Sequence, residues 1–144
     1  MIKSVRKIYF AGAIRGGRED VEIYLELVRL LRLAGAVLTE HVADLDIGAD
    51  GEASDDRSIY ERDLSWLRDS DCLVAEVTRP SLGVGFEIGR ATEWRKPVLC
   101  LFRPSDGRQL SAMISGCDSV SVREYESIGD AAKIVEEFLL SLDS

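Results

Sequence analysis

The sequence is poor in cysteine, histidine and proline, and it has no long apolar run. Its 144 residues include three cysteines, one histidine and three prolines. The cysteines, at 72, 100 and 117, are odd in number and lack the C-x-x-C spacing of a zinc site. We therefore expect no metal, and the scattered thiols predict a reducing compartment such as the cytoplasm. No segment approaches the roughly 20 apolar residues of a membrane helix, so no membrane association is expected.

Positive charge is also scarce. The chain carries 18 Lys and Arg against 26 Asp and Glu, a net charge of −8, and no basic cluster is visible. Nucleic-acid polymers are held by massed Lys and Arg, so they are not expected partners. A single nucleotide needs only a few local donors and is compatible with this charge.

Two nucleotide-binding motifs are missing as well. Neither G-x-G-x-x-G nor the P-loop pattern follows the first apolar run, so dinucleotide and ATP binding are disfavoured and no cofactor is predicted. The hydrophobic fraction of 46% and the charged fraction of 31% are typical of a globular protein. The length predicts one domain, residues 1–144.

What is present is an alternation of apolar runs and helix-like segments. We expect strands at 7–11, 37–39, 72–77, 97–102 and, weakly, 120–122, and helices at 18–33, 55–69, 86–95, about 110–114, and 128–142. This order predicts an α/β fold, a flavodoxin-like five-stranded parallel sheet of order 2-1-3-4-5 covered on both faces. Ligands of such sheets bind beside the loops after strands 1 and 3, here residues 12–17 and 78–85.

Two carboxylates could carry chemistry near that crevice. Glu87 is expected in the first turn of the helix that follows loop 78–85, where it is either a nucleophile or an ordinary partner of the helix dipole. Asp63 shares a predicted helix face with Ile59 and Leu67. A charge within an apolar stripe must be paired, neutralised or functional, and the expected structural partner is Arg62 or a residue at the end of a strand. The residues alone leave both alternatives open.

Other polar residues near the crevice have equally ordinary alternatives. Tyr9 on the first strand either packs in the core or faces the ligand, and Arg15 is either a ligand-facing cation or solvated. His41 follows the second strand, and a lone histidine is more often structural. Ser81 and Gly83 could offer a hydroxyl and backbone N–H groups to a phosphate.

Taken together, five stretches make the chain recognisable. They are Y-F-A-G-A-I-R-G-G-R-E-D (9–20), L-T-E-H-V-A (38–43), D-L-S-W-L (63–67), A-E-V-T-R-P-S-L-G-V-G-F-E-I-G-R-A (75–91) and C-L-F-R-P-S-D-G-R-Q-L-S-A-M-I (100–114). In this order they closely resemble the 2'-deoxynucleoside 5'-monophosphate N-glycosidases of the nucleoside 2-deoxyribosyltransferase superfamily. The resemblance spans nearly the whole chain.

The resemblance implies a flavodoxin-like homodimer that cleaves a deoxynucleoside monophosphate into free base and 2-deoxyribose 5-phosphate. By resemblance, the nucleophile is Glu87, which forms a covalent intermediate, Tyr9 orients it, and Asp63 is the acid near the base. The resemblance places phosphate-binding residues at Arg15, Ser81, Gly83 and, from the neighbouring subunit, Ser111, and it places His41 near the base. The predicted binding set is completed by Gly12, Ile14, Gly16 and Met113.

Two positions depart from the family pattern. Ala13 stands where a serine is usual, and Phe86 stands where a tyrosine is usual. The first departure removes a hydroxyl near the sugar and phosphate. Neither touches the predicted catalytic pair, so base preference is the property they affect.

Three competing functions remain at this point. A nucleoside 2-deoxyribosyltransferase usually has an aspartate at the position of Ser81, and replacing an anion by a hydroxyl favours a phosphorylated substrate. An N-glycosidase of CMP or hydroxymethyl-CMP shares most of the motifs. A non-catalytic nucleotide-binding module is a function of another class, but it would gain nothing from having both Glu87 and Asp63.

Overall fold

The computed structural model describes residues 5–13, 20–38, 55–104 and 107–143. Five strands and five helices follow one another in these ranges. In chain order they are β1 (Lys7–Ala11), α1 (Val21–Arg32), β2 (Ala36–Leu38), α2 (Asp56–Asp69), β3 (Cys72–Glu76), α3 (Leu82–Glu93), β4 (Val98–Phe102), α4 (Ala112–Ser115), β5 (Val120–Glu124) and α5 (Ile128–Ser141).

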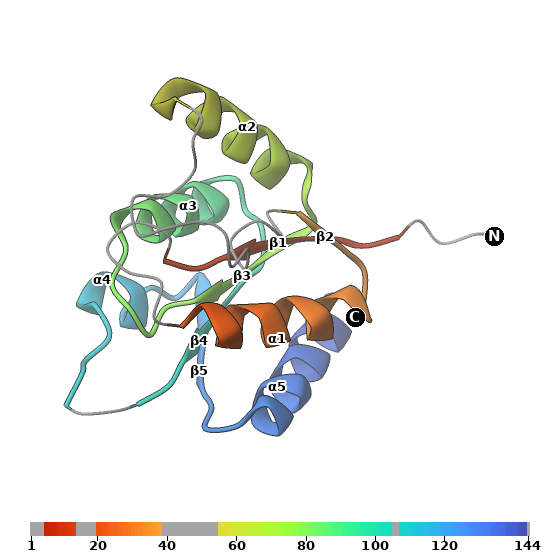
Figure 1. Cartoon of the computed structure of the whole chain (residues 1–144), viewed down its shortest axis with the longest axis vertical. Helices are drawn as coiled ribbons and strands as arrows, with labels where there is room; N and C mark the ends of the chain where they lie inside the picture. The colour runs from red at the N-terminus through yellow and green to blue at the C-terminus, as the bar shows by residue number, and fades with distance from the viewer. Residues whose placement is uncertain (1–4, 14–19, 39–54, 105–106, 144) are drawn as a thin grey trace.

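The strands form one parallel sheet of order β2-β1-β3-β4-β5, which confirms the predicted topology. Helices α1 and α5 cover one face, and α2, α3 and α4 cover the other (Figure 1). The chain reverses its direction across the sheet between β1 and β3, so the ends of these two strands flank the ligand crevice typical of this architecture. No helix in the described part of the chain is long and apolar enough to cross a membrane.

Alternation along the strands divides the core into two layers. Phe10 packs with α1 and α5, whereas its neighbour Tyr9 packs with α2 and α3, as expected from the two-residue repeat of a strand. The middle strands β3 and β4 are buried along their whole length, which explains why their sequences read as continuous apolar runs. Cys72 and Cys100 are fully buried in these strands as small core residues.

The start of α3 corrects the sequence prediction. The helix begins at Leu82 rather than Phe86, because the Ser81 hydroxyl accepts a hydrogen bond from the Val84 N–H at 3.2 Å and caps the helix. Gly83 therefore belongs to the helix and not to a loop. Glu87 lies in the second turn rather than the first, so the helix dipole is not the main influence on its charge.

Two other boundaries also differ. Helix α1 spans Val21–Arg32 with Leu33 as its C-cap, so it begins three residues later than expected. A Cβ at Gly35 would lie 2.3 Å from the carbonyl oxygen of Arg6, and this close approach is what requires glycine. Strand β5 extends to Glu124, two residues beyond the expected end, because it is held by full pairing with β4 despite its polar sequence.

Candidate active site

Tyr9, Asp63 and Glu87 come together where α2 and α3 pack against β1. Asp63 from α2 and Glu87 from α3 line one cavity of about 250 Å³, whose wall also includes Tyr60, Leu64, Gly83 and Phe86. Tyr9 on β1 is 1% exposed and interacts electrostatically with both acids. Three residues that are far apart in the sequence therefore lie close together in the fold, and their roles stay predictions.

Glu87 has the electrostatics of a buried functional carboxyl. Its pKa is raised to about 7: burial is the largest cause and the negative charge of Asp63 acts in the same direction, whereas a hydrogen bond with Tyr9 lowers the pKa. Burial disfavours the charged form because the low-dielectric surroundings cannot replace its hydration. Glu87 is therefore poised to change protonation near neutral pH, a property shared by many catalytic acids and bases.

Tyr9 is hydrogen-bonded to Glu87. Burial and the nearby charges of Glu87 and Asp63 raise the pKa of Tyr9 far above its ordinary value. The phenol is thus a permanent hydrogen-bond donor, and the Glu87 carboxylate is its acceptor. Tyr9 lies in the middle of β1 rather than at its end, between Leu38 and Leu73 of the neighbouring strands.

Asp63 has an ion-pair partner and also lines the cavity of Glu87. Its carboxylate is paired with Arg62, whose Nη2 lies at 2.9 Å and whose Nε lies at 3.0 Å from Oδ1. The Arg62 guanidinium in turn lies 4.8 Å from the ring centroid of Trp66. The pairing predicted as the structural alternative is present, and it holds Asp63 beside the Glu87 cavity rather than away from it.

The predicted phosphate-binding residues are divided between two cavities. Gly83 lines the Glu87 cavity, whereas Ser81, Ser111 and Met113 line a second cavity of about 510 Å³ between α3 and α4. The Ser111 hydroxyl accepts a hydrogen bond from the Met113 N–H at 3.2 Å and caps α4. Within one chain, Ser111 is thus beside Ser81 and not at the cavity that holds Glu87.

Gly12 has a packing reason to be glycine. A Cβ there would lie 3.0 Å from the Tyr24 ring, whose hydroxyl accepts a hydrogen bond from the Ala13 N–H at 3.2 Å. The remaining predicted binding residues lie outside the described residues. These are Ile14, Arg15, Gly16 and His41.

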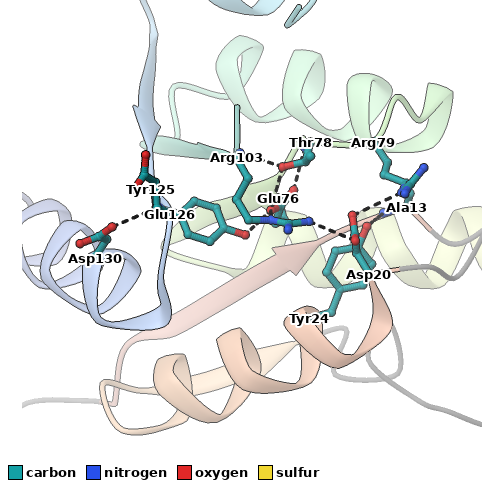
Figure 2. A network of polar contacts seen from close by, with 10 residues as sticks. All are labelled: Ala13, Asp20, Tyr24, Glu76, Thr78, Arg79, Arg103, Tyr125, Glu126 and Asp130. Atoms are coloured by element: carbon teal, nitrogen blue, oxygen red, sulfur yellow. Dashed lines mark hydrogen bonds and ion pairs between the residues drawn. The ribbon is translucent and has the colours of Figure 1, made fainter. Parts of the chain in front are cut away.

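A buried polar network beside the site was missed by the sequence analysis. Glu76, the last residue of β3, is fully buried and accepts hydrogen bonds from the Thr78 N–H at 2.7 Å, the Thr78 hydroxyl at 3.0 Å and the Tyr125 hydroxyl. The Arg103 N–H donates to the Thr78 hydroxyl at 2.9 Å, so the network ties together the ends of β3, β4 and β5 (Figure 2).

Two arginines extend this network to the start of α1. Asp20 lies 3.0 Å from Nη2 of Arg103 and 3.4 Å from Nε of Arg79, and Arg103 also lies 3.7 Å from Glu76 (Figure 2). Asp20, the N-cap residue of α1, is therefore paired with two arginines. A signal existed in the sequence, because Arg-Pro-Ser follows both β3 and β4, at 79–81 and 103–105.

Comparison with known proteins places these features in a family. The family model described as nucleoside 2-deoxyribosyltransferase matches residues 8–136. A Nematostella vectensis protein named putative 2'-deoxynucleoside 5'-phosphate N-hydrolase 1 is 51% identical, covering 97% of this chain and 98% of the relative. Proteins named 5-hydroxymethyl-dUMP N-hydrolase are 53% identical in Tetraodon nigroviridis, covering 92% of this chain and 96% of the relative, and 52% identical in Homo sapiens, covering 91% and 78%.

Solved structures share the fold at much lower identity. A CMP N-glycosidase from Clostridium botulinum superposes with a TM-score of 0.66 at 14% identity, over 92% of this chain and 99% of the other. A 2-deoxyribosyltransferase from Bacillus psychrosaccharolyticus gives a TM-score of 0.65 at 20% identity, over 88% and 90%. Their likeness establishes the architecture.

Proposed function

This chain belongs to the nucleoside 2-deoxyribosyltransferase family, and on that premise we propose that it hydrolyses the N-glycosidic bond of 2'-deoxynucleoside 5'-monophosphates. The products would be the free base and 2-deoxyribose 5-phosphate. The observation that carries the proposal is that Asp63 and Glu87 line one cavity and both interact with the buried Tyr9, with the pKa of Glu87 raised to about 7. Relatives about half identical in sequence are named N-hydrolases of such nucleotides.

The Glu87 carboxylate is proposed as the nucleophile. Departure of the base leaves positive charge on the sugar, which a carboxylate beneath the anomeric carbon stabilises and then captures as a covalent ester. One C–O bond forms, the C–N bond breaks, and its electron pair leaves with the base. Water then attacks the same carbon and releases Glu87. Tyr9 holds the carboxylate for both steps through its hydrogen bond.

The departing base needs a proton, and Asp63 is proposed to deliver it. The negative charge of Asp63 contributes to the raised pKa of Glu87, and the two neighbouring carboxyl groups are proposed to share one proton. The working form of the pair holds one proton, with Glu87 charged and Asp63 protonated at the moment of bond cleavage. The water that resolves the ester then returns a proton to Asp63, which restores the starting state.

The 5'-phosphate is proposed to bind near the N-terminus of α3. Helix N-termini offer unpaired backbone N–H groups and a positive dipole end, both of which favour an anion. Ser81, the N-cap residue of α3, is a neutral hydroxyl and does not repel a phosphate, unlike the aspartate usual in deoxyribosyltransferases. Arg15 is proposed as the cation that completes this site.

We also propose that a second copy of the chain covers the 510 Å³ cavity and delivers Ser111 to its partner's active site. The cavity is bordered by Leu82 and Met113, which are 97% and 82% exposed. A Cβ at Gly85 would meet no atom within 4 Å, so packing within one chain does not require glycine there. Close approach of a second chain would account for both the exposed apolar side chains and the glycine.

A panel of substrates tests the proposed function. Purified protein is incubated with dGMP, dCMP, dUMP, 5-hydroxymethyl-dUMP and CMP, and base release is followed by chromatography. We expect release from at least one deoxynucleotide and almost none from the matching nucleoside. Preferred cleavage of CMP would indicate the ribonucleotide alternative, base exchange without hydrolysis would indicate a transferase, and binding without turnover would indicate a non-catalytic module.

The shared site is tested by mixing two impaired variants. Glu87→Gln and Ser111→Ala subunits can together form one hybrid site that carries both wild-type residues. We expect mixing to restore part of the activity, provided that Ser111→Ala is itself severely impaired. A monomer by sedimentation at micromolar concentration would contradict the dimer.

A further inference from the structure

Two aromatic side chains stand at the Glu87 cavity without being buried. Tyr60 on α2 is 46% exposed and Phe86 on α3 is 47% exposed, and both line the cavity together with Asp63 and Glu87. Their ring centroids lie 6.0 Å apart at an interplanar angle of 57°. Large aromatic rings are normally hidden in a core, so a half-exposed pair beside two catalytic carboxyl groups needs another explanation.

Arg90 ties the two rings to each other. Its Nη2 lies 3.2 Å from the Tyr60 hydroxyl, and its Cζ lies 5.2 Å from the centroid of Phe86. The same guanidinium lies 5.8 Å from the centroid of Trp94, which is anchored on the core beneath α3. The Arg90 guanidinium contacts the Tyr60 hydroxyl and the rings of Phe86 and Trp94, and these contacts limit how far Tyr60 and Phe86 can move. The two rings therefore hold their relative positions before a ligand binds.

From this arrangement we propose that Tyr60 and Phe86 are the contact surface for the nucleobase and determine base preference, with Arg90 as the positioning residue that holds them. The inference rests on the proposed function, in which Glu87 and Asp63 act on the bond between sugar and base. The base must then project from that bond into the same cavity, where the two rings offer π-faces and apolar edges.

Aromatic contact recognises any planar base but does not bind all bases equally. Stacking on an aromatic side chain contributes enough affinity to change binding by about 5-fold to 100-fold per base. The contribution grows with ring area, so a purine would gain more from the pair than a pyrimidine. The sugar phosphate has no π-face and would gain nothing from it.

The test compares substitutions that remove a ring with substitutions that keep it. We expect Tyr60→Leu and Phe86→Leu each to raise KM for nucleotides about tenfold, with kcat changed less than threefold, and with a larger loss for dGMP than for dCMP. Tyr60→Phe and Phe86→Tyr retain the rings and are expected to keep KM within about threefold. Glu61→Ala, on the exposed side of α2, serves as the matched control.

The product 2-deoxyribose 5-phosphate separates base contact from damage to the site. Its inhibition constant is expected to be unchanged in every Tyr60 and Phe86 variant. The inference is overturned if the leucine variants keep wild-type KM for all nucleotides, or if they weaken the binding of nucleotide and sugar phosphate equally. If the wild type releases no base from any nucleotide, the proposed function fails instead of this inference. In that case, the binding of dGMP and dCMP is measured by tryptophan fluorescence in the wild type and the leucine variants, and this decides whether the rings contact a base.

Discussion

Two carboxyl groups, the fully buried Glu76 and the partly buried Glu87, share several features in this molecule but are expected to have different tasks. Each is hydrogen-bonded to a tyrosine, Glu76 to Tyr125 and Glu87 to Tyr9, and burial raises the pKa of each. Each is also placed by β3 or by the helix that follows it. From residue type, tyrosine partner and direction of pKa shift alone, the two are hard to tell apart.

Their partners separate them. Glu76 is fully buried and receives three hydrogen bonds, with Arg103 3.7 Å away, so its oxygens are fully used by the protein. Glu87 lies on a cavity, and its main charged neighbour is Asp63, which repels it. A carboxylate with all its partners in the protein stabilises the fold, whereas one that faces a cavity and a like charge is available to a substrate.

Replacing Glu87 should have the largest effect on chemistry. We expect Glu87→Gln to lower kcat more than about 1000-fold, because an amide neither attacks the anomeric carbon nor stabilises its charge. Base release under saturating substrate measures this. A variant that retains more than a few per cent of wild-type turnover would refute the role of Glu87 as nucleophile. Intact mass of the wild type should show an adduct of one deoxyribose phosphate.

The same variant should not lose stability. The folded-state pKa of Glu87, about 7, lies above the ordinary value of 4.5, so the folded protein holds a proton that the unfolded chain releases. Wild-type stability therefore falls as pH rises from about 4.5 to about 7, and this penalty persists at higher pH. Glutamine carries no charge and so removes this penalty. Urea unfolding at pH 8 should show that the free energy of unfolding of Glu87→Gln is higher than that of the wild type by up to about 3 kcal/mol.

Replacing Asp63 should have the next largest effect. Asp63→Asn is expected to lower kcat about 100-fold while changing KM little, because the acid acts on the leaving base. In the wild type, kcat/KM should fall above about pH 7 as the pair loses its last proton. Asp63→Asn has no carboxylic acid at this position to deprotonate, so its kcat/KM should not fall above about pH 7. Normal turnover would reduce Asp63 to a structural partner of Arg62.

Replacing Glu76 should give the opposite result from replacing Glu87. Glu76→Gln puts an amide group among donors that a carboxylate satisfies and removes the charge beside Arg103, so we expect a loss of about 1–3 kcal/mol in the free energy of unfolding. Folded variant protein should keep kcat within about threefold of the wild type. Urea unfolding and base release, measured on the same preparation, check both. A loss of turnover without a loss of stability would contradict the structural role.

The order of the elements was accessible from the sequence because it depends on local patterns. The alternation of apolar runs with helical periods predicted the sheet order correctly, and Asp55 was correctly expected near the start of α2. The start of α3 was wrong because Gly83 and Gly85 suggested a loop, whereas the Ser81 cap and packing against the sheet keep them helical. Here tertiary packing outweighs the low helix propensity of glycine.

The candidate site was only partly accessible, because its properties arise from distant residues. The resemblance led to Glu87, Asp63 and Tyr9, and the membership of the family is confirmed, but the roles of these residues stay predictions. The raised pKa of Glu87 depends on burial between three elements, which no local pattern expresses. The network around Glu76 was missed because Tyr125 lies 49 residues further along the chain, although the two side chains meet at the carboxyl ends of their strands.

Among Glu87, Asp63 and Tyr9, replacing Tyr9 should lower kcat the least and should shift the pH profile in a defined direction. Its hydrogen bond lowers the pKa of Glu87 and so favours the charged nucleophile. Tyr9→Phe removes that bond without emptying the core, so we expect kcat to fall about tenfold at neutral pH. The falling limb of the pH profile should also move to higher pH, because the pair now holds its proton more tightly. The matching variant Tyr125→Phe removes the corresponding bond to Glu76 and should weaken folding while leaving the pH profile in place. A shifted profile in Tyr125→Phe, or none in Tyr9→Phe, would show that the two tyrosine–glutamate pairs do not differ as their partners indicate.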